Sequence, residues 1–216
     1  MSKQAIQILK PFGPSIAKVT IPEKLILDLN NYIDTIISNE KKSAELDHGT
    51  KLVGQVKQEF KLEMDFMNKI GWTNFLSNSV ANWIYQSTGK KITKFGLIAS
   101  WVVRQFQNEY NPVHWHNGHV SGAGYLKVPK TFGGHIQKEK MNKNKNGNLE
   151  LIHGSRMFLS NSAVNFKPEV GSFYLFPHYL MHSVYPFYDS DEERRSISFN
   201  ASIDPHIYDV YTKSNE

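Results

Sequence analysis

Apolar and polar positions in the first third of the chain predict a short strand followed by helices. Residues 15–21 alternate between apolar and polar side chains, which is the period of a half-buried strand. In residues 23–39, which follow a proline, the apolar side chains recur at helical spacing and predict an amphipathic helix. A second helix is expected over Trp72–Tyr85 and should end at Gly89, whereas residues 39–60 are polar and are expected to be irregular.

From about residue 92 onward, short β-rich segments alternate with turn residues. These segments are 95–106, 122–128, 163–166, 171–176, 182–185 and 196–203. Many short strands without intervening helices are typical of a β-sandwich or barrel rather than of alternating βαβ units. We therefore expect one mainly β domain over residues 1–216. Residues 1–91 should supply strand and helical support on one outer face, and residues 92–216 the jelly-roll core.

The composition is that of a globular protein, and it excludes sulfur chemistry. Of the 216 residues, 40% are hydrophobic and 21% are charged, and no apolar run is long enough to predict a membrane-spanning helix. We expect neither a secretory signal nor a membrane partner. Because the chain has no cysteine, a metal site must use His, Asp or Glu. This composition is compatible with a reducing compartment, and we expect a cytoplasmic protein.

The net charge of +5 is a weak indicator of the partner. Much of the excess lies in residues 137–148, QKEKMNKNKNGN, where lysines alternate with Asn rather than with aromatic residues. Proteins that bind nucleic acids usually combine basic and aromatic residues on one face, so this stretch disfavours nucleic acid and favours a solvated loop. We expect the loop between Thr131 and Leu151 to border the functional site and to help admit or cover a substrate.

Two of the nine histidines form an HxH motif near the middle of the chain. If the segment PVHWH is a strand that ends at the turn Asn117–Gly118, His114 and His116 project from the same face. Two imidazoles on one face suit a shared metal ion. The alternative is a polar rim with a histidine packed beside Trp115, and a motif this short does not decide between the two.

A second histidine cluster follows an apolar strand. In residues 171–184, GSFYLFPHYLMHSV, the strand leads through a turn to His182, which has apolar neighbours. A histidine in that setting is either a hydrogen-bonded core residue or a further metal ligand. His178, beside Pro177 at the turn, is the competing candidate and ranks below His182.

The third element is the segment 194–200, RRSISFN. Written as a strand, it places four polar side chains on one face, namely Arg194, Ser196, Ser198 and Asn200. An inward arginine suits recognition of a carboxylate, and Ser196 on the same face can donate a further hydrogen bond. The alternative is that both arginines belong to the solvated run DEERR. Periodicity favours Arg194 as the inward residue, but a register shift of one residue would exchange it with Arg195.

Together these motifs resemble those of the non-haem iron, 2-oxoglutarate-dependent oxygenases. The order HxH, SGAGYLKVP (residues 121–129), GSFYLFPHYLMH and RRSISFN is similar to that of a small bacterial and phage subgroup, in which an SGxxY strand follows the first histidines. The similarity also reaches Pro11–Gly13 and the first helix. It implies a double-stranded β-helix, a cupin-like jelly roll, with Fe(II) at its mouth.

The resemblance also implies which residues form the site. The implied metal ligands, all histidines, are His114, His116 and His182. In the broad family the position of His116 is usually an aspartate, so three neutral imidazoles would leave the iron more positive by one charge. The resemblance further implies that 2-oxoglutarate chelates the iron. Arg194 and Ser196 would hold its distal carboxylate, and Tyr125 would be a second donor there.

The implied function is a dioxygenase that hydroxylates a substrate with O2 and releases succinate and CO2 from 2-oxoglutarate. One alternative is a cupin-like tri-His metalloenzyme that does not use 2-oxoglutarate and binds zinc, iron or manganese. Another is a non-catalytic jelly-roll binding module with structural histidines. The substrate, a small molecule or a peptide, does not follow from the sequence, although a basic mouth would suit an acidic or phosphorylated one. The oligomeric state does not follow either.

Overall fold

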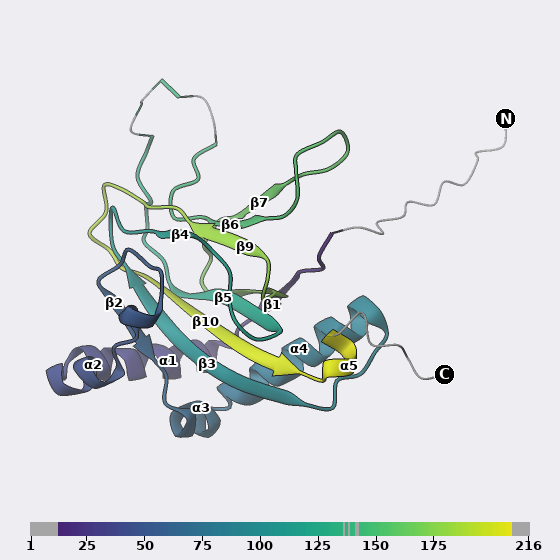
Figure 1. Cartoon of the computed structure of the whole chain (residues 1–216). Coiled ribbons are helices and arrows are strands. Elements are labelled where there is room, and N and C mark those ends of the chain that lie inside the picture. The colour runs from purple at the N-terminus through teal and green to yellow at the C-terminus, as the bar shows by residue number, and fades with distance from the viewer. Residues whose placement is uncertain (1–12, 136, 138, 141–142, 209–216) are drawn as a thin grey trace, which may run out of the picture.

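The computed structural model describes residues 13–135, 137, 139–140 and 143–208 (Figure 1). Its helices are α1 (Glu23–Ile37), α2 (Glu40–Leu46), the 3-10 turn η1 (Gly49–Lys51), α3 (Met64–Ile70), α4 (Trp72–Thr88) and α5 (Pro205–Tyr208). Its strands are β1 (Ala17–Thr20), β2 (Gln58–Lys61), β3 (Phe95–Gln105), β4 (Asn111–His114), β5 (Val120–Lys127), β6 (Leu149–Ile152), β7 (Ala163–Phe166), β8 (Ser172–Pro177), β9 (Met181–Val184) and β10 (Arg194–Ile203). Pro11 and Phe12, to which the family resemblance extends, lie outside the described residues.

Two antiparallel sheets face each other. The larger sheet has the strand order β1-β8-β5-β10-β3-β2, and the smaller has the order β4-β9-β6-β7. Helices α1, α3 and α4 lie on the side of the larger sheet that faces away from the smaller one (Figure 1). The predicted mainly β architecture with N-terminal helices on one outer face is therefore confirmed. Among the described residues, no helix is both long and apolar enough to span a bilayer.

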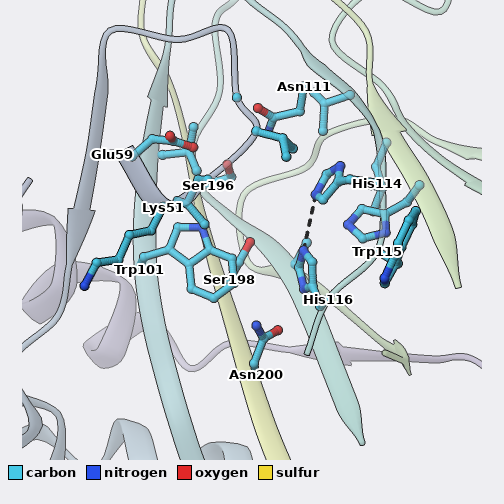
Figure 2. Close-up of a pocket in the computed structure, with 18 of the residues that line it drawn as sticks. Lys51, Glu59, Trp101, Asn111, His114, Trp115, His116, Ser196, Ser198 and Asn200 are labelled. Carbon is cyan, nitrogen blue, oxygen red and sulfur yellow. Dashed lines mark hydrogen bonds between the residues drawn. The ribbon is translucent and has the colours of Figure 1, made fainter. Parts of the chain in front are cut away.

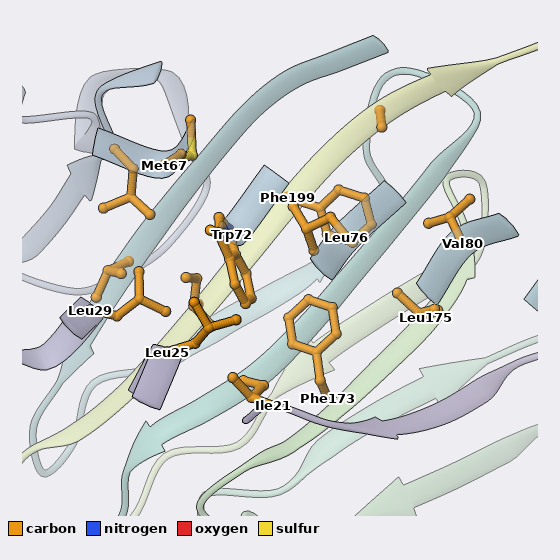
Figure 3. Packing of buried hydrophobic residues seen from close by; sticks show 14 of the residues in the cluster. Ile21, Leu25, Leu29, Met67, Trp72, Leu76, Val80, Phe173, Leu175 and Phe199 are labelled. Carbon is orange, nitrogen blue, oxygen red and sulfur yellow. The ribbon is translucent and has the colours of Figure 1, made fainter. Parts of the chain in front are cut away.

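The main core lies between the helices and the larger sheet. Trp72 and Leu76 of α4 are fully buried and pack with Phe173 and Phe199 of the sheet (Figure 3). Glycines on β5 make room for these rings. A Cβ atom on Gly124 would lie 2.2 Å from the Phe173 ring and 2.7 Å from a backbone oxygen. The glycines of the SGAGY segment therefore face the helices, and the residues that alternate with them face the other sheet.

A smaller apolar cluster lies between the two sheets. Its fully buried members are Tyr125, Leu149, Leu151, Tyr174, Phe176, Leu180 and Val184. They come from β5 and β8 of the larger sheet and from β6 and β9 of the smaller one, except Leu180, which lies in the turn between β8 and β9. This cluster holds the sheets together beside the cavity described below.

Several elements differ from those predicted. Residues 39–60 are not irregular throughout: they contain α2, η1 and the start of β2, and the Asn39 side chain caps α2 by accepting from the backbone N–H of Lys42. Helix α3 and strand β6 were not predicted at all. Each of the missed segments has seven residues or fewer, so too few positions carry a periodic signal. By contrast, α4 ends as expected at Gly89, which has a φ of 73°.

Candidate active site

Three histidines from neighbouring segments converge at the mouth of the sandwich. The register of β4 and β9 sets His114 directly opposite His182. His116 follows the end of β4, and its backbone N–H donates to the carbonyl of His178 at 3.0 Å. The ring centroids are 4.2 Å apart for His114 and His182, 4.7 Å for His116 and His182, and 5.2 Å for His114 and His116. One nitrogen from each of the three rings lies within 4.8 Å of the others.

Backbone carbonyls fix the tautomer of two of these rings. The Nδ1 atom of His114 is 2.8 Å from the carbonyl oxygen of Pro112, and Nδ1 of His182 is 2.9 Å from that of Leu180. A carbonyl oxygen only accepts hydrogen bonds, so each Nδ1 carries the proton. The Nε2 atom of each ring is then left with a free lone pair, the form in which imidazole binds a metal.

A hydroxyl and an amide fix the third ring in the same way. Ser121 Oγ donates to Oδ1 of Asn200 at 2.7 Å and lies 3.0 Å from Nδ1 of His116. Because the serine proton is used toward Asn200, Ser121 accepts the Nδ1–H of His116. The lone pair of this ring is therefore also on Nε2.

The three Nε2 atoms face one another, and none of them carries a proton. Nε2 of His116 lies 3.2 Å from Nε2 of His114 (Figure 2). Two nitrogens at about 2.1 Å from one ion, at a right angle, are about 3.0 Å apart, so the spacing fits adjacent ligands of a metal. The residues present fit Fe(II), for which imidazole is a suitable ligand. Among the described residues no carboxylate joins this group.

Burial keeps the rings neutral. Loss of solvation and, to a smaller extent, the neighbouring His114 together lower the pKa of His116 to about 3. Burial also lowers the pKa of His114 and brings that of His182 well below its ordinary value. Near neutral pH the three rings are therefore neutral, with the proton on Nδ1 and Nε2 free, as a metal site requires. His178, the competing candidate, lies outside the group, with its ring nitrogens 2.9 Å from the carbonyl of His116 and 2.8 Å from the Tyr208 hydroxyl.

Strand β10 separates the two arginines. Arg194 lines the cavity together with Ser196, Ser198 and Asn200. Arg195 points to the opposite face, where its guanidinium forms ion pairs at 2.7 Å with Asp34 and with Glu193. The inward residue of the pair is therefore Arg194.

Arg194 is a buried cation that lacks an acidic partner. It is 2% exposed, and its Nη1 donates to Oε1 of Gln105 at 2.8 Å and to Ser196 Oγ at 3.4 Å. Within the described part of the chain no carboxylate pairs with Arg194, and its Nε has no acceptor. The guanidinium lies 4.9 Å from the centre of the Tyr125 ring, whose buried hydroxyl also has no partner there. Burial lowers the pKa of Arg194 and raises that of Tyr125.

These unused donors fit the carboxylate of a small diacid. A buried cation and a buried hydroxyl without partners are costly unless a ligand satisfies them, and arginine binds carboxylates through paired N–H groups. The histidines and Arg194 line one cavity of about 150 Å³, so a single molecule can contact both. The six residues that the family resemblance assigns to the site all line this cavity: His114, His116, His182, Arg194, Ser196 and Tyr125.

Other parts of the cavity were not foreseen. Of the predicted loop 131–151, only Leu149 on β6 lines the cavity among the described residues, and the described lysines of the loop do not. Conversely, Glu59 of β2, Trp101 of β3 and Asn111 of β4 line it. No motif marks these three residues in the sequence, and Glu59 falls in the stretch that was expected to be irregular.

The comparison of sequences gives one family and no curated relative. Residues 99–200 match the family described as "Putative 2OG-Fe(II) oxygenase". The matched segment begins in β3 and ends in β10, and it includes the three histidines and Arg194. No curated protein matches the chain.

Solved structures share the fold. A prolyl-4-hydroxylase from Pseudomonas putida superposes with a TM-score of 0.54 at 13% identity, over 86% of this chain and 91% of that one. A prolyl hydroxylase from Trichoplax adhaerens, in complex with a peptide fragment of the hypoxia-inducible factor oxygen degradation domain, gives 0.54 at 14% identity, over 89% and 85%. The 2OG complex of a viral collagen prolyl hydroxylase from Paramecium Bursaria Chlorella virus-1 gives 0.50 at 14% identity, over 86% and 94%. The expected double-stranded β-helix is thereby confirmed.

Proposed function

We propose that this chain is an Fe(II)- and 2-oxoglutarate-dependent oxygenase that uses O2 to hydroxylate its substrate. The match of residues 99–200 to the 2OG-Fe(II) oxygenase family supports this proposal, and the solved structures that share the fold are consistent with it. In the balanced reaction, a substrate C–H, O2 and 2-oxoglutarate give the alcohol, succinate and CO2. The bound metal would supply the oxidising chemistry, and the protein supplies binding, orientation and exclusion of water.

The observation that carries this proposal is the placement of two complementary groups in one cavity. We assign His114, His116 and His182 as metal ligands because their Nε2 lone pairs converge. We assign Arg194, Ser196 and Tyr125 to the distal carboxylate of 2-oxoglutarate because Arg194 and Tyr125 carry unpaired buried donors. This division gives the diacid one carboxylate for the metal and one for the guanidinium.

The family match, the unpaired Arg194 and the converging histidines favour this function over both alternatives. A tri-His metalloenzyme that ignores 2-oxoglutarate has no use for the unpaired Arg194, and a purely structural role for the histidines leaves three lone pairs facing one another. For the substrate we propose a small molecule or a peptide. One similar structure contains a peptide fragment, which keeps the peptide within this class. A cytoplasmic location is part of the same proposal.

Anaerobic addition of Fe(II) and 2-oxoglutarate tests the function directly. The chelate is expected to give a metal-to-ligand charge-transfer band in the wild-type protein. His114→Ala and His182→Ala should abolish the band. His153→Ala, in which an exposed histidine outside the cavity is removed, should retain it. A wild-type protein without the band would contradict the proposed function. Metal binding without an effect of 2-oxoglutarate would instead favour the tri-His metalloenzyme.

A further inference from the structure

One wall of the cavity carries a buried acid that the proposed chemistry does not use. Glu59 on β2 is 2% exposed, and its Oε2 has no hydrogen-bond partner among the described residues. It does not belong to the histidine group that fits a metal. In Figure 2, Glu59 and Trp101 lie across the cavity from His114 and His116.

A second unpaired acceptor lies beside this acid. The buried Oδ1 of Asn111 also lacks a donor in the described part of the chain. Both side chains converge on Gly54: a Cβ atom there would lie 2.5 Å from Oδ1 of Asn111 and 2.8 Å from Oε1 of Glu59. A larger residue at position 54 would displace one of these side-chain ends, so the η1–β2 loop packs directly against two acceptor oxygens.

Among the residues that the structure describes, none supplies a cation that pairs with this acid. The neighbour that acts on Glu59 is another acid, Asp47, and burial together with Asp47 raises the pKa of Glu59 to about 7. Lys51, on the same cavity wall, is exposed, and Figure 2 shows its side chain directed away from the carboxyl group. Arg194 lines the part of the cavity that we assign to the distal carboxylate of 2-oxoglutarate, so it is not a partner for Glu59. A buried carboxyl group in this position is stabilised when a ligand brings a positive charge and N–H donors.

The aromatic residue on the same wall favours the same kind of ligand. Trp101 is 4% exposed, and its ring lies 5.4 Å from that of His116. Figure 2 shows it on the same side of the cavity as Glu59. Indole is the side chain that attracts cations most strongly through its ring face. An acid, an amide oxygen and an indole on one wall form a set of groups suited to a cationic nitrogen.

We propose that Glu59, Asn111 and Trp101 form the substrate subsite, and that the substrate presents an ammonium or guanidinium group to it. This inference rests on the proposed function, because the metal and 2-oxoglutarate occupy the opposite parts of the cavity only in an oxygenase. The basic loop of the sequence favoured an acidic substrate, whereas the cavity wall favours a basic one.

Binding of matched probes to the metal-loaded protein tests the subsite. The probes are the N-acetyl amides of lysine and arginine, compared with those of norleucine and citrulline, which have similar shapes and no side-chain charge. Calorimetry on the Zn(II)-loaded protein with 2-oxoglutarate is expected to give at least tenfold tighter binding for the cationic probes. Glu59→Gln should remove this preference, and Glu45→Gln, the same change at an exposed position of α2, should retain it.

The outcomes separate the subsite from the function. Equal binding of cationic and neutral probes to the wild-type protein would overturn the subsite whether or not the variants fold. A preference that survives in folded Glu59→Gln would also overturn it and would leave Glu59 as a charge that compensates the tri-His site. If Glu59→Gln does not fold, Asn111→Ala is the second variant, with a weakened preference expected. The charge-transfer band tests the oxygenase separately: a band without a cation preference contradicts the subsite alone, and a preference without a band contradicts the oxygenase alone.

Discussion

Ser121 determines which nitrogen of His116 is available to a metal. The serine hydroxyl has one proton, and Asn200 takes it, so the serine can only accept from the imidazole. His114 and His182 reach the same tautomer through backbone carbonyls, which substitution of a side chain does not remove. His116 is therefore the one ligand candidate whose orientation depends on side chains.

Ser121→Ala tests this dependence. Loss of a partner that orients a metal-binding histidine typically costs about 10–100-fold in metal affinity. We expect a decrease of this size for Fe(II), measured by anaerobic titration, with little change in the melting temperature. Ser183→Ala is the matched control, because Ser183 lies next to His182 on β9 but does not line the cavity. Unchanged Fe(II) affinity in Ser121→Ala would show that packing alone orients His116.

At this scale the sequence predicts residues that belong to motifs and misses those that do not. His114, His182 and Arg194 were identified because histidine spacing and strand alternation can be recognised in the amino-acid sequence. Glu59 and Asn111 were not, because their place in the cavity depends on how β2 pairs with β3 and β4 with β9. Strand pairing is a property of the folded sheet, and a four-residue strand carries too little pattern to predict it.

At the scale of elements, β10 gives two adjacent arginines opposite roles. Its alternation places Arg194 in the cavity and Arg195 among Asp34, Glu193 and Asn30, where it connects the sheet to α1. The period of two was evident from the sequence, but the register was not, since a shift by one residue would exchange the roles. The structure fixes the register through the pairs that β10 forms with β3 and β5.

Substituting each arginine by methionine separates the two roles. Arg194→Met should raise the dissociation constant of 2-oxoglutarate at least 100-fold. It should leave the melting temperature equal or higher, because it removes a buried cation that has no acidic partner. Arg195→Met should lower the melting temperature, since it removes two ion pairs at 2.7 Å and leaves Glu193 with Arg104 alone and Asp34 with the more distant Lys127. It should retain 2-oxoglutarate binding. The reverse result, with 2-oxoglutarate affinity lost only in Arg195→Met, would contradict the assignment of the strand faces.

At the scale of the whole molecule, folding disfavours the charged forms of several groups in the cavity. The histidines have lowered pKa values because burial penalises their charged forms, while burial raises the pKa of Glu59 to about 7. Much of the fold was predictable from the sequence because apolar periodicity specifies the two layers and the helical cover. The free-energy cost of charging the buried groups in the cavity was not predictable from the sequence. It depends on how completely the folded sheets exclude water from each group.

This cost predicts how the metal-free protein responds to acid. Below about pH 6.5 the unfolded chain protonates its histidines, whereas burial in the folded chain opposes protonation of His114, His116 and His182. The unfolded state then binds more protons, so stability falls with decreasing pH, by up to about 1.4 kcal/mol per pH unit for each histidine. Glu59 acts in the opposite direction, because its raised pKa lets the folded state bind a proton first between about pH 7 and pH 4.5. Three histidines outweigh one glutamate, and the net stability should decrease.

Urea unfolding in a metal chelator, from about pH 7 down to about pH 5, measures this balance. His116→Gln should make the decrease shallower because it removes one of the groups that resist protonation in the folded state. Glu59→Gln should make it steeper because it removes the opposing group. Saturating Zn(II) should raise the stability most at the upper end of the range, since protons compete with the metal for the same Nε2 lone pairs at the lower end. A stability that stays constant or rises on acidification would show that water reaches the three rings. In that case the imidazoles would be solvated and protonated on acidification like free histidines. Their Nε2 lone pairs would then not be held ready for a metal ion.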